Sequence, residues 1–220
     1  MVIILMRRIC SVLDNDVINQ NKEIYLELLN GIEREGFLKE QLLSLLNNSD
    51  FFTAPASTKY HGAYPGGLCE HSLDVYKELK MLSNKFPQYF YTEDTIRIVS
   101  LLHDISKVNL YKKDIRNKKV YHEAGSKTDN LGRFDWVSEE AYSVDNENKF
   151  IFGNHEQTSE FIVRQYMPLF VEESVALLHH HGGMGWDSTQ VDITRIFNKY
   201  PLALMLHTAD MLATYLDQNE

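Results

Sequence analysis

The sequence predicts an all-α fold, a helical bundle that carries a small β-hairpin insertion. Apolar residues recur at helical spacing through most of the chain, whereas the segment at about 111–152 combines turn residues with short β-like pieces. No linker or internal repeat divides the chain. Its 220 residues, 44% of them hydrophobic, suffice for one buried core, so we expect a single domain over residues 1–220.

Individual elements follow from the same apolar patterns. Helices are expected at about 17–32, 37–46, 68–82, 92–107, 156–166, 171–180 and 201–216. Thr92 can cap the fourth of these, and Pro201 suits the first position of the last. Prolines and glycines predict a long loop at 47–67. Strand-like pieces at 120–121, 134–137 and 142–144 predict one or two hairpins within the insertion.

Composition excludes several classes of protein. The formal net charge of −9 makes general binding to duplex nucleic acid unfavourable. No apolar run approaches the roughly 18–20 residues that cross a membrane. The apolar start Val2–Met6 precedes its arginines, the reverse of a secretory signal, and Met6 is an alternative start to Met1. Because Cys10 and Cys69 are too few for a disulfide framework, we expect reduced thiols in a cytoplasmic protein.

Five separate segments carry histidine or aspartate residues that could bind a metal ion. They contain His71, His103 with Asp104, His155, the run His179–His181, and Asp210. Imidazole and carboxylate ligands suit Mn, Fe, Co, Ni and Zn, and a shell without cysteine favours a catalytic site over structural zinc. An aspartate can also offer one oxygen to each of two ions.

The remaining histidines have a simpler interpretation. A lone histidine is more often a core or surface residue than a ligand, and we apply this to His122. We apply it with reservation to His61 and His207. His61 lies in the loop before His71 and could reach substrate, and His207 stands one turn before Asp210 and could support that ligand.

Four stretches resemble the motifs of HD-domain hydrolases. Residues 64–76 (YPGGLCEHSLDVY) resemble the first-histidine motif, and residues 100–107 (SLLHDISK) resemble the namesake motif. Residues 207–213 (HTADMLA) resemble the closing aspartate motif, and residues 180–182 (HHG) the histidines of binuclear members. They follow the family's order. The resemblance implies an HD-domain bundle with its core at about 66–216 and a metal-dependent phosphohydrolase activity.

The resemblance also implies a role for each matching residue. The primary metal ligands would be His71, His103, Asp104 and Asp210, with Asp104 bridging to a second ion. The second ion would be bound by His155 and His180, with His181 as a further ligand, whereas a helical position would turn His179 away. Two departures are present: Ser106 stands where the family usually has glycine, and His155 falls one position later than in some relatives.

Basic and aromatic residues follow the His-Asp motif. In the family pattern Lys107 faces the substrate phosphate, and the alternative is an exposed lysine at a helix end. Together with Asp104 it is a candidate catalytic residue, and Lys107, Arg116 and His61 are candidate substrate contacts. The basic run around Arg116 also fits a solvated loop. The aromatic residues of the insertion fit either packing over the helical core or a lid that stacks a base.

These features predict a phosphohydrolase or phosphodiesterase that acts on a small, nucleotide-like phosphate ester through metal-activated water. One or two divalent ions are expected, Mn, Fe, Co, Ni or Zn, with Mg as a further candidate. Three alternatives remain: an HD-type diiron oxygenase, an RNA-directed HD nuclease, and a non-catalytic nucleotide-binding regulatory protein. Oxygen uptake, steeply salt-dependent RNA binding, and nucleotide binding without turnover would identify them respectively.

Overall fold

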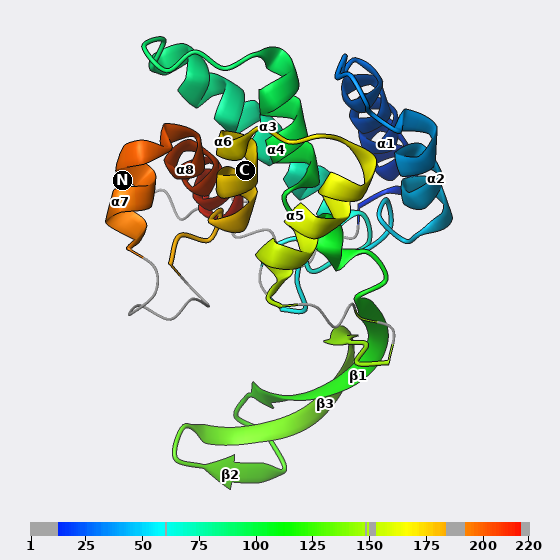
Figure 1. Ribbon diagram of the computed structural model, residues 1–220. Coiled ribbons are helices and arrows are strands. Elements are labelled where there is room, and N and C mark those ends of the chain that lie inside the picture. The colour runs from blue at the N-terminus through cyan, green and yellow to red at the C-terminus, as the bar shows by residue number, and fades with distance from the viewer. Residues whose placement is uncertain (1–12, 60, 148, 150–152, 184–191, 217–220) are drawn as a thin grey trace.

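The computed structural model describes residues 13–59, 61–147, 149, 153–183 and 192–216 (Figure 1). Within these ranges the chain is mostly helical, as predicted, with one small antiparallel sheet. The choice between Met1 and Met6, Cys10 and the predicted end of the insertion at residue 152 lie outside the described residues.

Every helix expected from apolar periodicity is present. The helices are α1 (Asn15–Asn30), α2 (Lys39–Asn48), α3 (Gly67–Lys85), α4 (Glu93–Leu102), α5 (His155–Tyr166), α6 (Val171–Leu178), α7 (Ile193–Lys199) and α8 (Pro201–Tyr215). Thr92 caps α4 as expected, its side chain accepting from the backbone N–H of Thr95. The short helix α7 was not predicted, because its apolar residues Ile193, Ile196 and Phe197 have helical spacing over little more than one turn.

The core lies between α1, α3, α4, α6 and α8. Helix α3 packs against α4 and α8, and α6 packs against α8. Fully buried side chains such as Leu79, Leu101 and Leu206 fill the space between them. The hydroxyl of Tyr25 donates to the backbone carbonyl of Leu101 at 2.8 Å, which ties α1 to the end of α4. These contacts fix the helix ends at which the candidate ligands lie.

For two helices, an earlier end than expected corrects the placement of metal-site residues. Helix α4 ends at Leu102, and a short 3-10 turn (Ile105–Lys107) follows, so His103 and Asp104 lie in the break and not on a continuous helix. Helix α6 ends at Leu178, so the run His179–His181 forms a turn. The argument that a helix rotates His179 away is therefore wrong. In a turn, successive side chains point in directions that a helix does not allow.

The insertion forms a long ribbon instead of short hairpins. Strands β1 (Tyr111–Tyr121), β2 (Lys127–Asp129) and β3 (Gly132–Val144) are antiparallel in the order β1-β3-β2. Strands β1 and β3 pair along their whole length, from Tyr111 opposite Val144 to Tyr121 opposite Phe134. The ribbon projects from the helical body and curves beneath it (Figure 1). Among the described residues, none of the ribbon belongs to the main core, so its aromatic residues do not pack over that core.

Candidate metal centre

His71 is positioned by a close approach between a loop and the start of α3. Gly66, the residue before the helix, has φ +84°, a conformation that favours glycine. A Cβ on Gly67 would lie 2.2 Å from the carbonyl oxygen of Gly62, so only glycine allows this approach. His71 follows one turn later and is completely buried. The Gly-Gly pair of the first motif thus serves to place this histidine.

The first group of candidate ligands is His71, His103 and Asp210. Their ligand atoms lie within 4.8 Å of one another, and all three residues are buried. The Nε2 atom of His71 is 3.1 Å from Oδ1 of Asp210 and 3.3 Å from Nε2 of His103. The Nδ1 atom of His103 donates to the carbonyl of Ser100 at 2.7 Å. That bond selects the tautomer in which Nε2 carries a lone pair, as a metal ligand must.

The second group is His155, His180 and His181, whose ligand atoms also lie within 4.8 Å of one another. The Nδ1 atom of His180 donates to the carbonyl of Leu177 at 2.8 Å, so its Nε2 likewise presents a lone pair. His155 is the first residue of α5. A capping box holds it there, in which Asn154 and Gln157 bond each other's backbone N–H groups. The Nε2 atoms of His155 and His180 are buried without hydrogen-bond partners.

Asp104 lies between the two groups. Its Oδ2 is 3.8 Å from Nε2 of His71 and 3.4 Å from Nε2 of His103. Its Oδ1 is 3.8 Å from Nε2 of His155 and 3.7 Å from Nε2 of His180. The latter separations are too long for hydrogen bonds, and Oδ1 has no other hydrogen-bond partner. One carboxylate therefore turns a different oxygen toward each histidine group.

This arrangement fits one or two metal ions. Buried polar atoms without partners are rare in folded proteins, yet Asp104, His155 and His180 each contribute one here. Donor atoms roughly 3–3.5 Å apart are what ligands at about 2.1 Å from a common ion require. The histidine and aspartate groups can thus hold a metal ion, and Asp104 lies between them.

Charge at the centre is balanced within the protein. Burial would raise the pKa of Asp104, but Lys107 and His103 outweigh it and hold that pKa well below its usual range. The Nζ atom of Lys107 lies 2.6 Å from Oδ2 of Asp104 and is buried. Burial alone would lower the pKa of Lys107, but Asp104 raises it, so both groups stay charged.

His181 differs from the other histidines of its group. Its Nε2 lies 3.4 Å from Oδ2 of Asp210 and its Nδ1 lies 3.4 Å from Oε1 of Glu156. Burial would lower the pKa of His181, but hydrogen bonds to Asp210 and Glu156 outweigh it and raise that pKa to about 10. His181 would therefore have to release a proton before it could bind a metal ion.

The candidate substrate contacts separate into two sets. The ring of His61 lies 4.9 Å from the ring of His71, at the edge of the centre, and burial lowers the pKa of His61 to about 4. Lys107 is within the centre. Arg116 lies on the exposed middle of β1, opposite Glu139, about 16 Å along the strand from Tyr111. The structure thus brings His61 and Lys107 to the metal centre but not Arg116.

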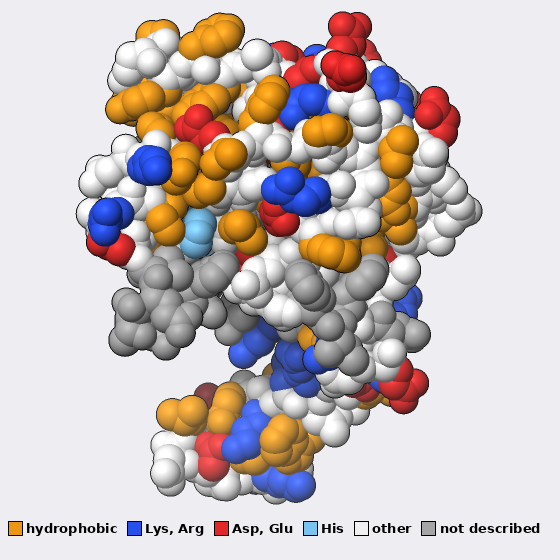
Figure 2. Space-filling model, in the orientation of Figure 1, with side chains coloured by type: hydrophobic (Ala, Val, Ile, Leu, Met, Phe, Trp, Pro, Cys, Tyr) orange, Lys and Arg blue, Asp and Glu red, His pale blue; other side chains and the backbone are white. Residues whose placement is uncertain are grey.

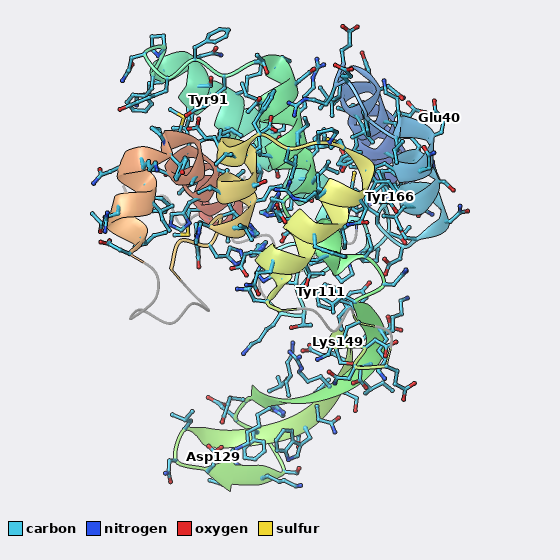
Figure 3. The ribbon with its side chains drawn as sticks, viewed as in Figure 1. Glu40, Tyr91, Tyr111, Asp129, Lys149 and Tyr166 are labelled. Carbon is cyan, nitrogen blue, oxygen red and sulfur yellow. The ribbon has the colours of Figure 1, made fainter. Side chains whose placement is uncertain are left out.

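Supporting residues were only partly visible in the sequence. His207 donates from Nδ1 to the carbonyl of His180 at 2.7 Å. It therefore supports a candidate ligand, as the sequence suggested, but that residue is His180 and not Asp210. Glu156 was not predicted in this role. Its buried carboxylate lies 3.4 Å from Nδ1 of both His155 and His181. Its position directly after His155, in the first turn of a helix, was the available signal. Tyr111 is at the point where β1 leaves the helical body (Figure 3).

Comparison with protein-family models, curated proteins and solved structures gave no match for this chain. None of the helices in the described ranges combines the length and the hydropathy needed to cross a bilayer. Function is therefore inferred from the geometry of the candidate metal centre and from the resemblance of the short motifs around it.

Proposed function

We propose that this protein is a metal-dependent phosphohydrolase of the HD-domain type, acting on phosphate esters of small molecules, with nucleotides the first class to test. The observation that carries the proposal is the position of Asp104, whose two oxygens face two separate histidine groups. A single metal site would need only one of these groups. A bridging carboxylate between two ions is the arrangement that phosphoester hydrolysis commonly uses.

The candidate ligands would bind the two ions in two groups. His71, His103 and Asp210 would hold one ion, His155 and His180 the other, and Asp104 both. Bound ions would lower the pKa of a coordinated water molecule and neutralise charge on the phosphate. Backbone carbonyls of Ser100 and Leu177 keep the rings of His103 and His180 in the ligating tautomer.

Lys107 gives the centre a cation of its own. Its ammonium is buried beside Asp104, within reach of any phosphate bound at that carboxylate. A preorganised positive charge stabilises the negative charge that develops on phosphate oxygens during displacement. Glu156 orients the rings of His155 and His181 through their Nδ1 atoms, and it stays a carboxylate because hydrogen bonding by His181 offsets the effect of burial on its pKa.

The proposal is tested by metal content and turnover in one preparation. Elemental analysis of the wild-type chain should give close to two transition-metal ions, and Asp104→Ala should lose them. Wild-type protein reconstituted with Mn, Fe, Co or Ni should hydrolyse bis(4-nitrophenyl) phosphate and nucleotide esters. Asp114→Ala is the matched control, because this carboxylate lies on the exposed surface of β1. It should keep both metal content and turnover.

Three outcomes would contradict the proposal. Failure to bind any metal after reconstitution would remove the mechanism and favour a nucleotide-binding protein without turnover. Two iron ions with oxygen uptake and no ester hydrolysis would identify an oxygenase on the same ligand set. Equal loss of metal in Asp104→Ala and Asp114→Ala would show that the substitution acts on folding and not on the site.

A further inference from the structure

The register of the ribbon gathers its aromatic residues on one face. In an antiparallel pair, residues directly opposite each other share a face, and alternate residues along a strand return to it. Tyr111, Tyr121, Phe134, Trp136 and Tyr142 all lie on the same face by this rule. Tyr111 is also the first residue of β1, four positions after Lys107, and lies where the ribbon leaves the helical body (Figure 3). The aromatic face therefore begins at the centre and continues outward along the ribbon.

The tip of the ribbon holds a preformed aromatic cluster. Phe134 is buried, and the rings of Tyr121 and Trp136 lie against it at centroid distances of 5.6 and 5.7 Å. Yet Tyr121 is 42% and Trp136 49% exposed. The ammonium of Lys119 lies 4.4 Å from the centroid of the Phe134 ring and 5.6 Å from that of Trp136. Rings held in place in this way can stack on a ligand with little loss of side-chain entropy.

The charge of this region opposes that of the whole chain. Strands β1 and β3 together carry six lysine or arginine residues and four acidic residues, whereas the chain has a formal net charge of −9. Lys118 and Lys119 form ion pairs with Glu139 and Asp129. Nearer the metal centre, Lys112 and Lys113 face the neutral Ser143 and Tyr142 across the sheet. Basic and hydrophobic side chains accordingly lie side by side on the ribbon in Figure 2.

We propose that the aromatic face of the ribbon binds a single-stranded polynucleotide, with bases stacked on Trp136 and Tyr121 and phosphates near Lys113 and Lys119, the two lysines of β1 that share this face. Every base has a π-face, so alternating rings and cations bind single strands with little sequence preference. Eleven residues of strand span about 36 Å, which is longer than a mononucleotide and suits an extended ligand. The bound polynucleotide would end at the metal centre. Hydrolysis of its terminal phosphoester there rests on the proposed function.

A peptide added to the edge of the sheet fits this surface less well. In the sheet order β1-β3-β2, none of the strands that the structure describes pairs with the outer edge of β1. Its lysines are the type of residue that discourages edge-to-edge pairing of strands. Charge complementarity and exposed rings together favour an anionic ligand with flat bases.

The test is fluorescence anisotropy with a labelled single strand of about 12 nucleotides. The full chain carries Asp104→Asn, so that the ligand is not hydrolysed, and its fold is checked by circular dichroism. Trp136→Ala should raise the Kd roughly tenfold, and the pair with Tyr121→Ala should raise it further, since each stacked base contributes on this order. Trp136→Phe should largely restore binding. Val137→Ala is the matched control, because Val137 is similarly exposed but lies on the opposite face.

Each outcome separates this inference from the proposed function. Equal binding by the Trp136→Ala and Val137→Ala variants, equal binding of duplex, or equal competition by poly-glutamate would overturn it, because these results exclude base stacking. Hydrolysis of bis(4-nitrophenyl) phosphate by wild-type protein that binds no single strand would overturn the inference and leave the proposed function standing. Ribbon-dependent binding without any ester hydrolysis would support the inference and overturn the proposed function.

Discussion

The Nε2 atoms of His71 and His103 face each other at 3.3 Å inside the fully buried centre. Because Nδ1 of His103 donates to the Ser100 carbonyl, its Nε2 presents a lone pair toward His71. Asp210 approaches the same nitrogen of His71 at 3.1 Å. A cation shared by the three residues uses all of these lone pairs together, whereas a hydrogen bond between the two rings would use only one of them.

The two ligand groups should lose metal independently. We expect His71→Ala and His155→Ala each to lower the metal content by about one ion per chain, because each histidine belongs to a different group. Elemental analysis of the purified variants measures this directly. His122→Ala serves as the control, since His122 pairs with Asp135 on the ribbon. An unchanged metal content in His155→Ala would show that His155 and its group do not form a second metal site.

Lys107→Met should reduce turnover much more than it reduces metal content. The ligands stay in place, but the centre loses its buried cation beside Asp104. Removing one preorganised electrostatic group from a reacting centre commonly costs on the order of 100-fold in kcat. Steady-state hydrolysis and elemental analysis on the same sample test this. Lys85→Met, at the exposed end of α3, should leave kcat unchanged, and a similar loss in both variants would contradict the role given to Lys107.

His207 should act through His180. The His207 ring donates to the His180 carbonyl and stacks on Phe197 of α7, so His207→Ala frees the turn that carries His180. We expect the affinity for the second ion to fall roughly 10- to 100-fold, as for other residues that orient ligands. Titration calorimetry measures this. Thr208→Ala, at the half-buried next position of α8, is the control, and equal affinities of the two variants would exclude the positioning role.

Acid should weaken the start of α4 through Glu93. Burial would raise the pKa of Glu93, but hydrogen bonds from Tyr76 and Lys80 outweigh it and lower that pKa. A lowered folded-state pKa contributes stability above the unfolded value of about 4.5, and this contribution is lost as pH falls through the folded pKa.

Wild type should therefore exceed Glu93→Gln in unfolding free energy by at most about 1 kcal/mol near neutral pH, because the group is partly exposed and screened. The difference should shrink below about pH 4.5. Urea unfolding of both proteins at several pH values checks the trend, and a difference that stays constant with pH would contradict it.

Much of the metal centre could be predicted because its residues stand in recognisable motifs. The pattern around His71, His103 and Asp210 identified three candidate ligands that the structure brings together. The breaks that aim them could not be predicted. Nothing in Ile105, Ser106 and Lys107 opposes an α-helix, so the end of α4 at Leu102 depends on tertiary packing.

The ribbon was located correctly but its length was not predicted. Strand β1 is rich in lysine, which has a low preference for strands, and only its pairing with β3 makes it extended. Arg116 shows the consequence, because proximity in sequence to the His-Asp motif suggested a phosphate contact, whereas an extended strand carries it away. The orienting role of Glu156 was not predicted, since it depends on where the rings of His155 and His181 point.

The capping box at Asn154 makes the position of His155 independent of the ribbon that precedes it in the chain. The bonds between Asn154 and Gln157 set the start of α5, and hence His155, from within the helix itself. On the other side, β1 begins only after the short turn that carries Lys107. We therefore expect that changes in the length or the surface residues of the ribbon leave the candidate metal ligands in place. Substrate preference could then diverge among related proteins that keep the same reaction.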